Sequence, residues 1–211
     1  MNGPWRRWPL ESAAVHAGLK RIGILGGTFD PPHVGHVVAA AAALWELTLD
    51  KVILMTANIP WQKVGTRSVT SAPDRLAMVT LLAEGMANVQ VSTLELDRGG
   101  NSFTADTVQE LKALHEGAEL FVIIGSDIAP SLDTWKKTDE LKASATMVVY
   151  DRPGSAGGSP PDGWPFRRIA VPQLAVSSTD IRDRHREGRP VDGLVPPAVL
   201  RYINDRGLYT T

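Results

Sequence analysis

The sequence contains no cysteine among its 211 residues. This absence excludes disulfide bonds, zinc sites built on thiolates and a cysteine nucleophile. Charge of either sign is also not in excess, because 22 Lys and Arg stand against 23 Asp and Glu, for a formal net charge of −1. Non-specific binding to nucleic acid depends on a clear basic excess. The composition therefore gives no indication of a nucleic-acid partner.

Long hydrophobic runs are missing as well. A membrane-spanning helix needs about 20 consecutive apolar residues, whereas the longest candidate, residues 37–44, is rich in alanine and ends at Trp45 and Glu46. This run predicts a helix packed within a folded domain and no membrane span. Residues 1–19 lack the continuous apolar core of a signal peptide. We expect them to form a disordered extension outside the domain, and we expect a cytoplasmic protein.

Apolar runs and helical segments alternate along the rest of the chain. Hydrophobic residues make up 43% and charged residues 21%, as is usual for a globular domain. The runs typical of strands are residues 21–25, 51–56, 89–96, 119–124, 145–150 and 168–171. The segments typical of helices are residues 36–47, 74–86, 104–115, 179–187 and 197–205. This order predicts one α/β domain over residues 20–211, with a Rossmann-like, doubly wound, mostly parallel sheet flanked by helices and ligands at the carboxyl ends of its strands.

The most informative segment is residues 26–36, GGTFDPPHVGH, between the first strand and the first helix. Glycines after a strand allow the backbone to approach a ligand closely, and a helix N-terminus presents free N–H groups to phosphate. The segment is neither a P-loop nor a dinucleotide-binding fingerprint, because it lacks the spacing of both. His33 and His36 can face one phosphate chain, where a histidine is drawn toward its protonated form and stabilises developing charge. Asp30, before two prolines, is first of all a turn former.

The same segment resembles the first motif of the nucleotidyltransferase superfamily, a His/Thr-x-Gly-His element after the first strand. Residues 176–182, VSSTDIR, resemble its second motif, and residues 102–107, SFTADT, resemble a segment of the bacterial nicotinate-mononucleotide adenylyltransferases. Gly125-Ser126-Asp127, followed by Trp135, is similar to a further segment of that family. The resemblance spans about residues 21–209. Residues 59–63, IPWQK, depart from the Pro-Pro-His-Lys run of many members and resemble actinobacterial ones.

The resemblance implies transfer of AMP from ATP to nicotinic acid mononucleotide, giving nicotinic acid adenine dinucleotide and pyrophosphate in NAD biosynthesis. It implies ATP and the mononucleotide as partners, with no nucleic acid and no membrane, and leaves a homo-oligomer open. Mg²⁺ is expected to arrive largely on the phosphates of ATP, with no metal site formed by the protein. The acid mononucleotide is expected to be preferred over the amide.

The resemblance also implies roles for individual residues. Catalytic contacts are expected from His33, His36 and Arg182. ATP is expected to bind Gly26, Gly27, Thr28, Phe29, Asp127, Ser177, Ser178 and Thr179. The mononucleotide is expected to contact Lys63, Thr104 and Trp135, with the indole stacked on the pyridine.

Several of these assignments compete with a purely structural interpretation of the residue. Arg182 can be a surface arginine, Trp135 a tryptophan at the rim of the core, and Asp127 a helix cap. Lys63 is almost as well explained as a solvated loop lysine. For the whole chain the alternatives are a pantetheine-phosphate adenylyltransferase, which typically has Thr where His33 stands, and a pyridine-nucleotide sensor without catalysis. The presence of both histidines favours the enzyme.

Overall fold

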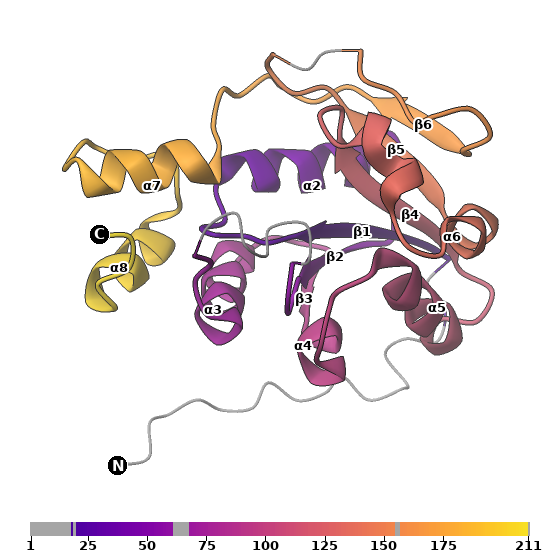
Figure 1. Ribbon diagram of the computed structural model, residues 1–211, viewed down its shortest axis with the longest axis horizontal. Helices are drawn as coiled ribbons and strands as arrows, with labels where there is room; N and C mark the ends of the chain where they lie inside the picture. The colour runs from indigo at the N-terminus through magenta and orange to yellow at the C-terminus, as the bar shows by residue number, and fades with distance from the viewer. Residues whose placement is uncertain (1–17, 19, 61–67, 155–156, 211) are drawn as a thin grey trace.

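The computed structural model describes residues 18, 20–60, 68–154 and 157–210 (Figure 1). The strands are β1 (Arg21–Gly27), β2 (Lys51–Thr56), β3 (Val89–Ser92), β4 (Glu119–Gly125), β5 (Thr146–Tyr150) and β6 (Phe166–Ile169). The α-helices are α2 (Val34–Glu46), α3 (Ala72–Ala83), α4 (Leu94–Arg98), α5 (Thr104–Leu114), α6 (Thr138–Ser144), α7 (Ser178–Arg186) and α8 (Pro197–Asp205), and η2 (Ala129–Thr134) is a 3₁₀-helix. The expectation for residues 1–19 falls almost entirely outside the described residues.

All six strands pair in parallel, in the order β3-β2-β1-β4-β5-β6. From β1 the strands β2 and β3 follow toward one edge of the sheet, and from β4 the strands β5 and β6 follow toward the other edge. Between these two strands lies the switch point where ligands of doubly wound sheets bind, beyond the carboxyl ends of the strands. The predicted fold class is confirmed.

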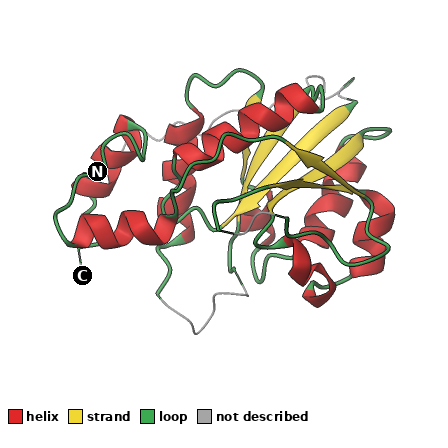
Figure 2. Cartoon of the chain, turned by 90° about the horizontal axis from the view of Figure 1, so that it is seen from above, coloured by secondary structure: helices red, strands yellow, loops and turns green. Residues whose placement is uncertain are grey.

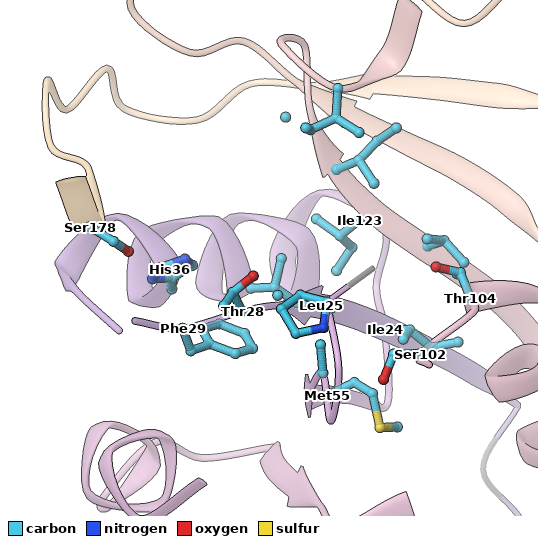
Figure 3. A pocket seen from close by; sticks show the side chains of 18 of the residues that line it. Ile24, Leu25, Thr28, Phe29, His36, Met55, Ser102, Thr104, Ile123 and Ser178 are labelled. Carbon is cyan, nitrogen blue, oxygen red and sulfur yellow. The ribbon is translucent and has the colours of Figure 1, made fainter. Parts of the chain in front are cut away.

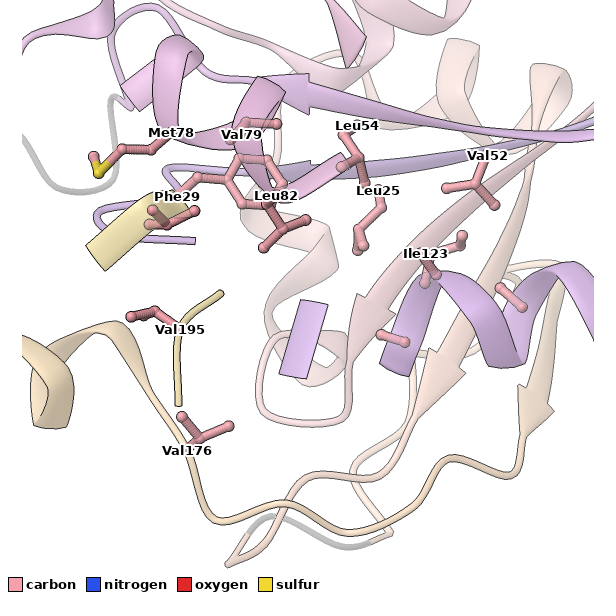
Figure 4. Close-up of a cluster of buried hydrophobic side chains, with 14 of the residues drawn as sticks. Leu25, Phe29, Val52, Leu54, Met78, Val79, Leu82, Ile123, Val176 and Val195 are labelled. Atoms are coloured by element: carbon pink, nitrogen blue, oxygen red, sulfur yellow. The ribbon is translucent and has the colours of Figure 1, made fainter. Parts of the chain in front are cut away.

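Side chains alternate between the two faces of the sheet, and each face has its own apolar core. Leu25, Leu54 and Ile123 point to one face, where they pack with residues of α2, α3, α7 and α8 (Figure 4). Ile24 and Val122 point to the other, where they pack with residues of α5, η2 and α6. Helices cover both faces of the sheet (Figure 2).

Two strand predictions need correction. The strand expected over residues 89–96 ends at Ser92, and α4 follows it. Leu94–Arg98 consists of residues with good to moderate helix propensity, and Gly99 ends the helix with a φ of 72°. The last strand, β6, begins two residues before the predicted residues 168–171. Within the described residues, no helix combines the length and the apolar character needed to cross a membrane.

Candidate active site

A cavity of about 530 Å³ opens beyond the carboxyl ends of β1 and β4. Every predicted site residue in the described part of the chain lines it. His36 and Ser178 lie toward one end and Ser102 and Thr104 toward the other, with Thr28 between them (Figure 3). Lys63 lies outside the described residues, so its role stays a prediction. The switch point of the sheet thus brings together motifs that are far apart in sequence.

The loop after β1 is held in a strained conformation. Phe29 has a φ of 52°, which a bulky side chain adopts only at an energetic cost. Its ring is buried, and the ring of His36 meets it edge to face at 4.8 Å between centroids. Burial of the phenyl ring offsets the strain and turns the loop so that Thr28 reaches the cavity.

The two histidines are arranged by the first turn of α2. His33 occupies the N-cap position, and its backbone N–H donates to Nδ1 of His36 at 3.1 Å. The two ring centroids lie 3.9 Å apart. Because Nδ1 of His36 accepts a hydrogen bond, the ring proton of neutral His36 sits on Nε2. His36 is therefore fixed as an Nε2–H donor.

Burial, and then the positive charge of Arg152, lower the pKa of His33 to about 3. The imidazole is therefore neutral at pH 7 in this structure. The protonated ring expected beside a phosphate chain stays a prediction.

Gly35, between the histidines, provides the space that the His33 ring occupies. A Cβ at position 35 would lie 3.0 Å from Cε1 and Nδ1 of His33 and 3.1 Å from Cγ1 of Val176. These distances are shorter than almost all real Cβ contacts. The glycine of the first motif thus allows His33 and the second motif to approach each other.

The second motif is joined to the loop after β1 by side-chain hydrogen bonds. The hydroxyl of Ser178 donates to the carbonyl of Pro31 at 2.8 Å, although 147 residues separate them in sequence. Arg182 donates to the carbonyl of Asp30 at 2.7 Å and to the hydroxyl of Thr179 at 3.2 Å. The guanidinium of Arg182 is half-buried and anchored at the cavity, and its catalytic role stays a prediction.

Ser177 caps α7, its hydroxyl accepting from the backbone N–H of Asp180 at 3.1 Å. Ser177 and Ser178 therefore shape the site through the backbone, and direct contacts with ATP remain predicted for both.

Asp30 has a larger role than that of a turn former. Its side chain is buried, and its Oδ1 accepts a 2.8 Å hydrogen bond from the hydroxyl of Tyr209. Burial, and then the negative charge of Asp30, raise the pKa of the Tyr209 hydroxyl, which stays protonated as a donor. Tyr209, near the carboxyl terminus, thereby helps to hold the loop after β1 in place.

Arg152 lines the cavity and was not found by the sequence analysis. Its guanidinium pairs with Asp127 at 3.2 Å, and its backbone N–H donates to the hydroxyl of Ser126 at 3.1 Å. A Cβ at Gly125 would lie 2.3 Å from the carboxylate of Asp127 and 2.7 Å from Cδ of Arg152, so the glycine makes room for the pair. Its position in the sequence could have indicated a site residue, since Arg152 follows the carboxyl end of β5, and ligands of such sheets bind beyond the carboxyl ends of the strands.

Thr104, Trp135 and Glu95 also line the cavity. Thr104 begins α5, whose N-cap residue Phe103 supplies no side-chain acceptor. Glu95 is buried and accepts from the hydroxyl of Thr107 at 2.6 Å. Burial is the largest effect on the Glu95 carboxyl and raises its pKa. Glu95 was missed because it lies in a segment predicted as strand.

Among the described residues, no group of three or more His, Cys, Asp or Glu side chains could hold a metal ion. The carboxylate of Asp127 is paired with Arg152.

The depressed pKa of His33 predicts a pH-dependent stability. Below about pH 6.5 the unfolded chain takes up a proton at this histidine while the folded chain does not, so the free energy of unfolding falls as the pH falls toward 3. Between pH 7.5 and 5.0 this one group should account for a loss of about 2 kcal/mol.

Urea unfolding of the wild type and of His33→Asn at both pH values measures this loss. The other titrating groups are common to both proteins, so the wild type should lose about 2 kcal/mol more than the variant. Equal losses would show that His33 titrates normally in the folded protein.

Comparison with known proteins agrees with the geometry. The model of the cytidylyltransferase-like family matches residues 24–184. A relative from Halalkalibacterium halodurans, named "Probable nicotinate-nucleotide adenylyltransferase", is 43% identical over 92% of this chain and 93% of its own length. A relative of the same name from Streptomyces coelicolor is 41% identical over 88% and 98%.

A solved structure with a similar fold is the nicotinic acid mononucleotide adenylyltransferase of Plasmodium falciparum complexed with APC. It is 18% identical to this chain, with a TM-score of 0.73 over 90% of this chain and 98% of its own. The chain therefore belongs to the cytidylyltransferase-like family and, within it, to the nicotinate-nucleotide adenylyltransferases.

Proposed function

We propose that the protein transfers AMP from ATP to nicotinic acid mononucleotide, forming nicotinic acid adenine dinucleotide and pyrophosphate in NAD biosynthesis. The observation that carries this proposal is the convergence on one cavity of both histidines, the second motif, Thr104 and Trp135. Thr104 lies at the end away from His36 and Ser178 (Figure 3). The names of relatives at about 40% identity support the same reaction. A second solved structure of the Plasmodium falciparum enzyme, complexed with NaAD, shares the fold with a TM-score of 0.72.

The reaction needs alignment more than covalent chemistry. A phosphate oxygen of the mononucleotide attacks the α-phosphorus of ATP and forms a new P–O bond. The bond from that phosphorus to the oxygen that bridges to the β-phosphorus breaks, and pyrophosphate leaves with the electron pair. The attacking phosphate is already ionised, so no general base is required, and the protein contributes positioning and charge stabilisation.

The described side chains can supply both contributions. The Nε2–H of His36 and the first turn of α2 provide donors for the phosphates of ATP. Arg182 adds a fixed positive charge at the same end, where its guanidinium can also bind phosphate. Arg152 is a second cation at the cavity, and its pairing with Asp127 fixes that carboxylate beside it.

Recognition of the acceptor would fall to the opposite end of the cavity. Trp135 offers a flat surface for the pyridine, and the backbone N–H groups at the start of α5 offer donors for its carboxylate. The pantetheine-phosphate alternative gains no support from this arrangement, and His33 stands where that enzyme typically has Thr.

The first test is pyrophosphate release from ATP with each of three acceptors: nicotinic acid mononucleotide, nicotinamide mononucleotide and phosphopantetheine. The acid should be preferred over the amide by roughly 5- to 150-fold, since an amide leaves a polar NH₂ group without a partner in the site. Trp135→Ala should weaken both pyridine acceptors and change the KM for ATP much less. Equal efficiency with acid and amide would contradict the proposed carboxylate recognition, and turnover with phosphopantetheine alone would refute the function.

Dependence on Mg²⁺ is a second test. The ion would be bound largely by the phosphates of ATP and would neutralise charge on the leaving pyrophosphate. Turnover in metal-free reagents with excess chelator should fall below a hundredth of the normal rate and return when Mg²⁺ is restored. Full activity in chelator would contradict the proposal.

A third test uses Gly35→Ala. The added methyl group would displace the His33 ring or the side chain of Val176 by a few tenths of an ångström. Displacement of phosphate donors by this amount should lower kcat/KM at least tenfold. Circular dichroism would establish that the variant is folded, and unchanged kcat/KM in a folded variant would show that the packing at Gly35 is unimportant for turnover.

A further inference from the structure

Arg75, in the first turns of α3, is a buried arginine that binds the backbone of several separate segments. Its side chain is 1% exposed. Nε donates to the carbonyl of Thr70 at 2.8 Å, and Nη1 donates to the carbonyls of Thr28 at 2.8 Å and Ala57 at 2.7 Å. Nη2 donates to the carbonyl of Asn58 at 2.9 Å. One guanidinium thus connects chain segments that follow β1, follow β2 and precede α3.

Thr28 belongs to the loop that lines the ATP end of the cavity. Its carbonyl accepts a hydrogen bond from Arg75, one of the buried residues of α3. The position of this part of the loop therefore depends on the position of the guanidinium.

Asn58 connects the same guanidinium to the acceptor end. Its backbone N–H donates to the hydroxyl of Ser102 at 2.9 Å, and its side-chain amide donates to the carbonyl of Gly100 at 3.0 Å. The N–H of Ser102 in turn donates to the carbonyl of Ile59 at 3.1 Å. Ser102 lies two residues before Thr104, where α5 begins. A continuous chain of hydrogen bonds thus runs from Thr28 through Arg75 to the acceptor segment.

Arginine is suited to this task because its donors lie in one rigid plane. A lysine presents a single ammonium group on a flexible stem and cannot reach carbonyls spread over three segments. Burial of a cation is costly unless its donors are satisfied. Backbone carbonyls of other residues accept hydrogen bonds from all three nitrogens of the Arg75 guanidinium. The contacts are made by backbone atoms, so the neighbouring side chains do not determine them.

We propose that Arg75 is a positioning residue that sets the distance between the ATP-binding loop and the segment that binds the acceptor. The inference rests on the proposed AMP transfer. Each substrate is expected to contact its own segment, so each should bind nearly normally when the guanidinium no longer links the two segments. The backbone bond from Ala57 N–H to the carbonyl of Gly27 still joins the ends of β1 and β2 in such a variant. The rate of transfer should fall, because it depends on the alignment of the attacking oxygen with the α-phosphorus.

The experiment compares the wild type, Arg75→Lys and Arg21→Lys. Arg21 is a matched control, since it also donates to a backbone carbonyl, that of Leu47, but at the amino end of β1. Calorimetric titration with ATP alone and with nicotinic acid mononucleotide alone gives the two affinities, and kcat is measured at saturation. Arg75→Lys should bind each substrate within about threefold of the wild type while kcat falls at least tenfold. Arg21→Lys should keep its kcat.

A kcat for folded Arg75→Lys within twofold of the wild type would overturn the inference, as would a loss of affinity large enough to account for the lost turnover.

If Arg75→Lys does not fold, Asn58→Ala decides instead. This variant removes the side-chain bond to Gly100 from an exposed position and should lower kcat about two- to fivefold with both affinities retained; an unchanged kcat would contradict the proposal. A wild type inactive with every acceptor would instead refute the proposed function, so the two failures are distinguishable.

Discussion

The site depends on the hydrogen bonds that join α7 to the loop after β1. Ser178 and Arg182 bind the carbonyls of Pro31 and Asp30. Two segments that are far apart in sequence thus form one wall of the cavity. These bonds use donors that are also suited to phosphate. The wall is held by hydrogen bonds within the protein, and such preorganisation lowers the cost of ordering a site when a ligand binds.

Polar side chains support this loop at three points. Tyr209 binds the side chain of Asp30, Arg75 binds the backbone of Thr28, and the ring of His33 occupies the space beside Gly35. Burial of Asp30 and Arg75 would be costly without these partners, which confines the loop to few conformations. The strained backbone of Phe29 persists within this support.

Much of the fold and most of the site could be predicted from the sequence. Buried parallel strands are continuous apolar runs, and the glycine-rich corner after β1 locates the ligand edge, so the sheet and both histidines were found. Arg75 and Tyr209 could not be found in this way, because their roles depend on carbonyls and carboxylates brought near only by folding. The low pKa of His33 is likewise a consequence of burial, and α4 was missed because short apolar and acidic segments fit strands and helices equally well.

The central claim is direct transfer, in which the acceptor phosphate attacks ATP and no side chain becomes covalently attached to AMP. The stereochemistry at phosphorus tests it most directly. ATP carrying sulfur in one configuration at the α-phosphorus is converted to the dinucleotide, and the configuration of the product is determined. A single in-line displacement predicts inversion. Retention would require two displacements through a covalent enzyme intermediate and would contradict the account.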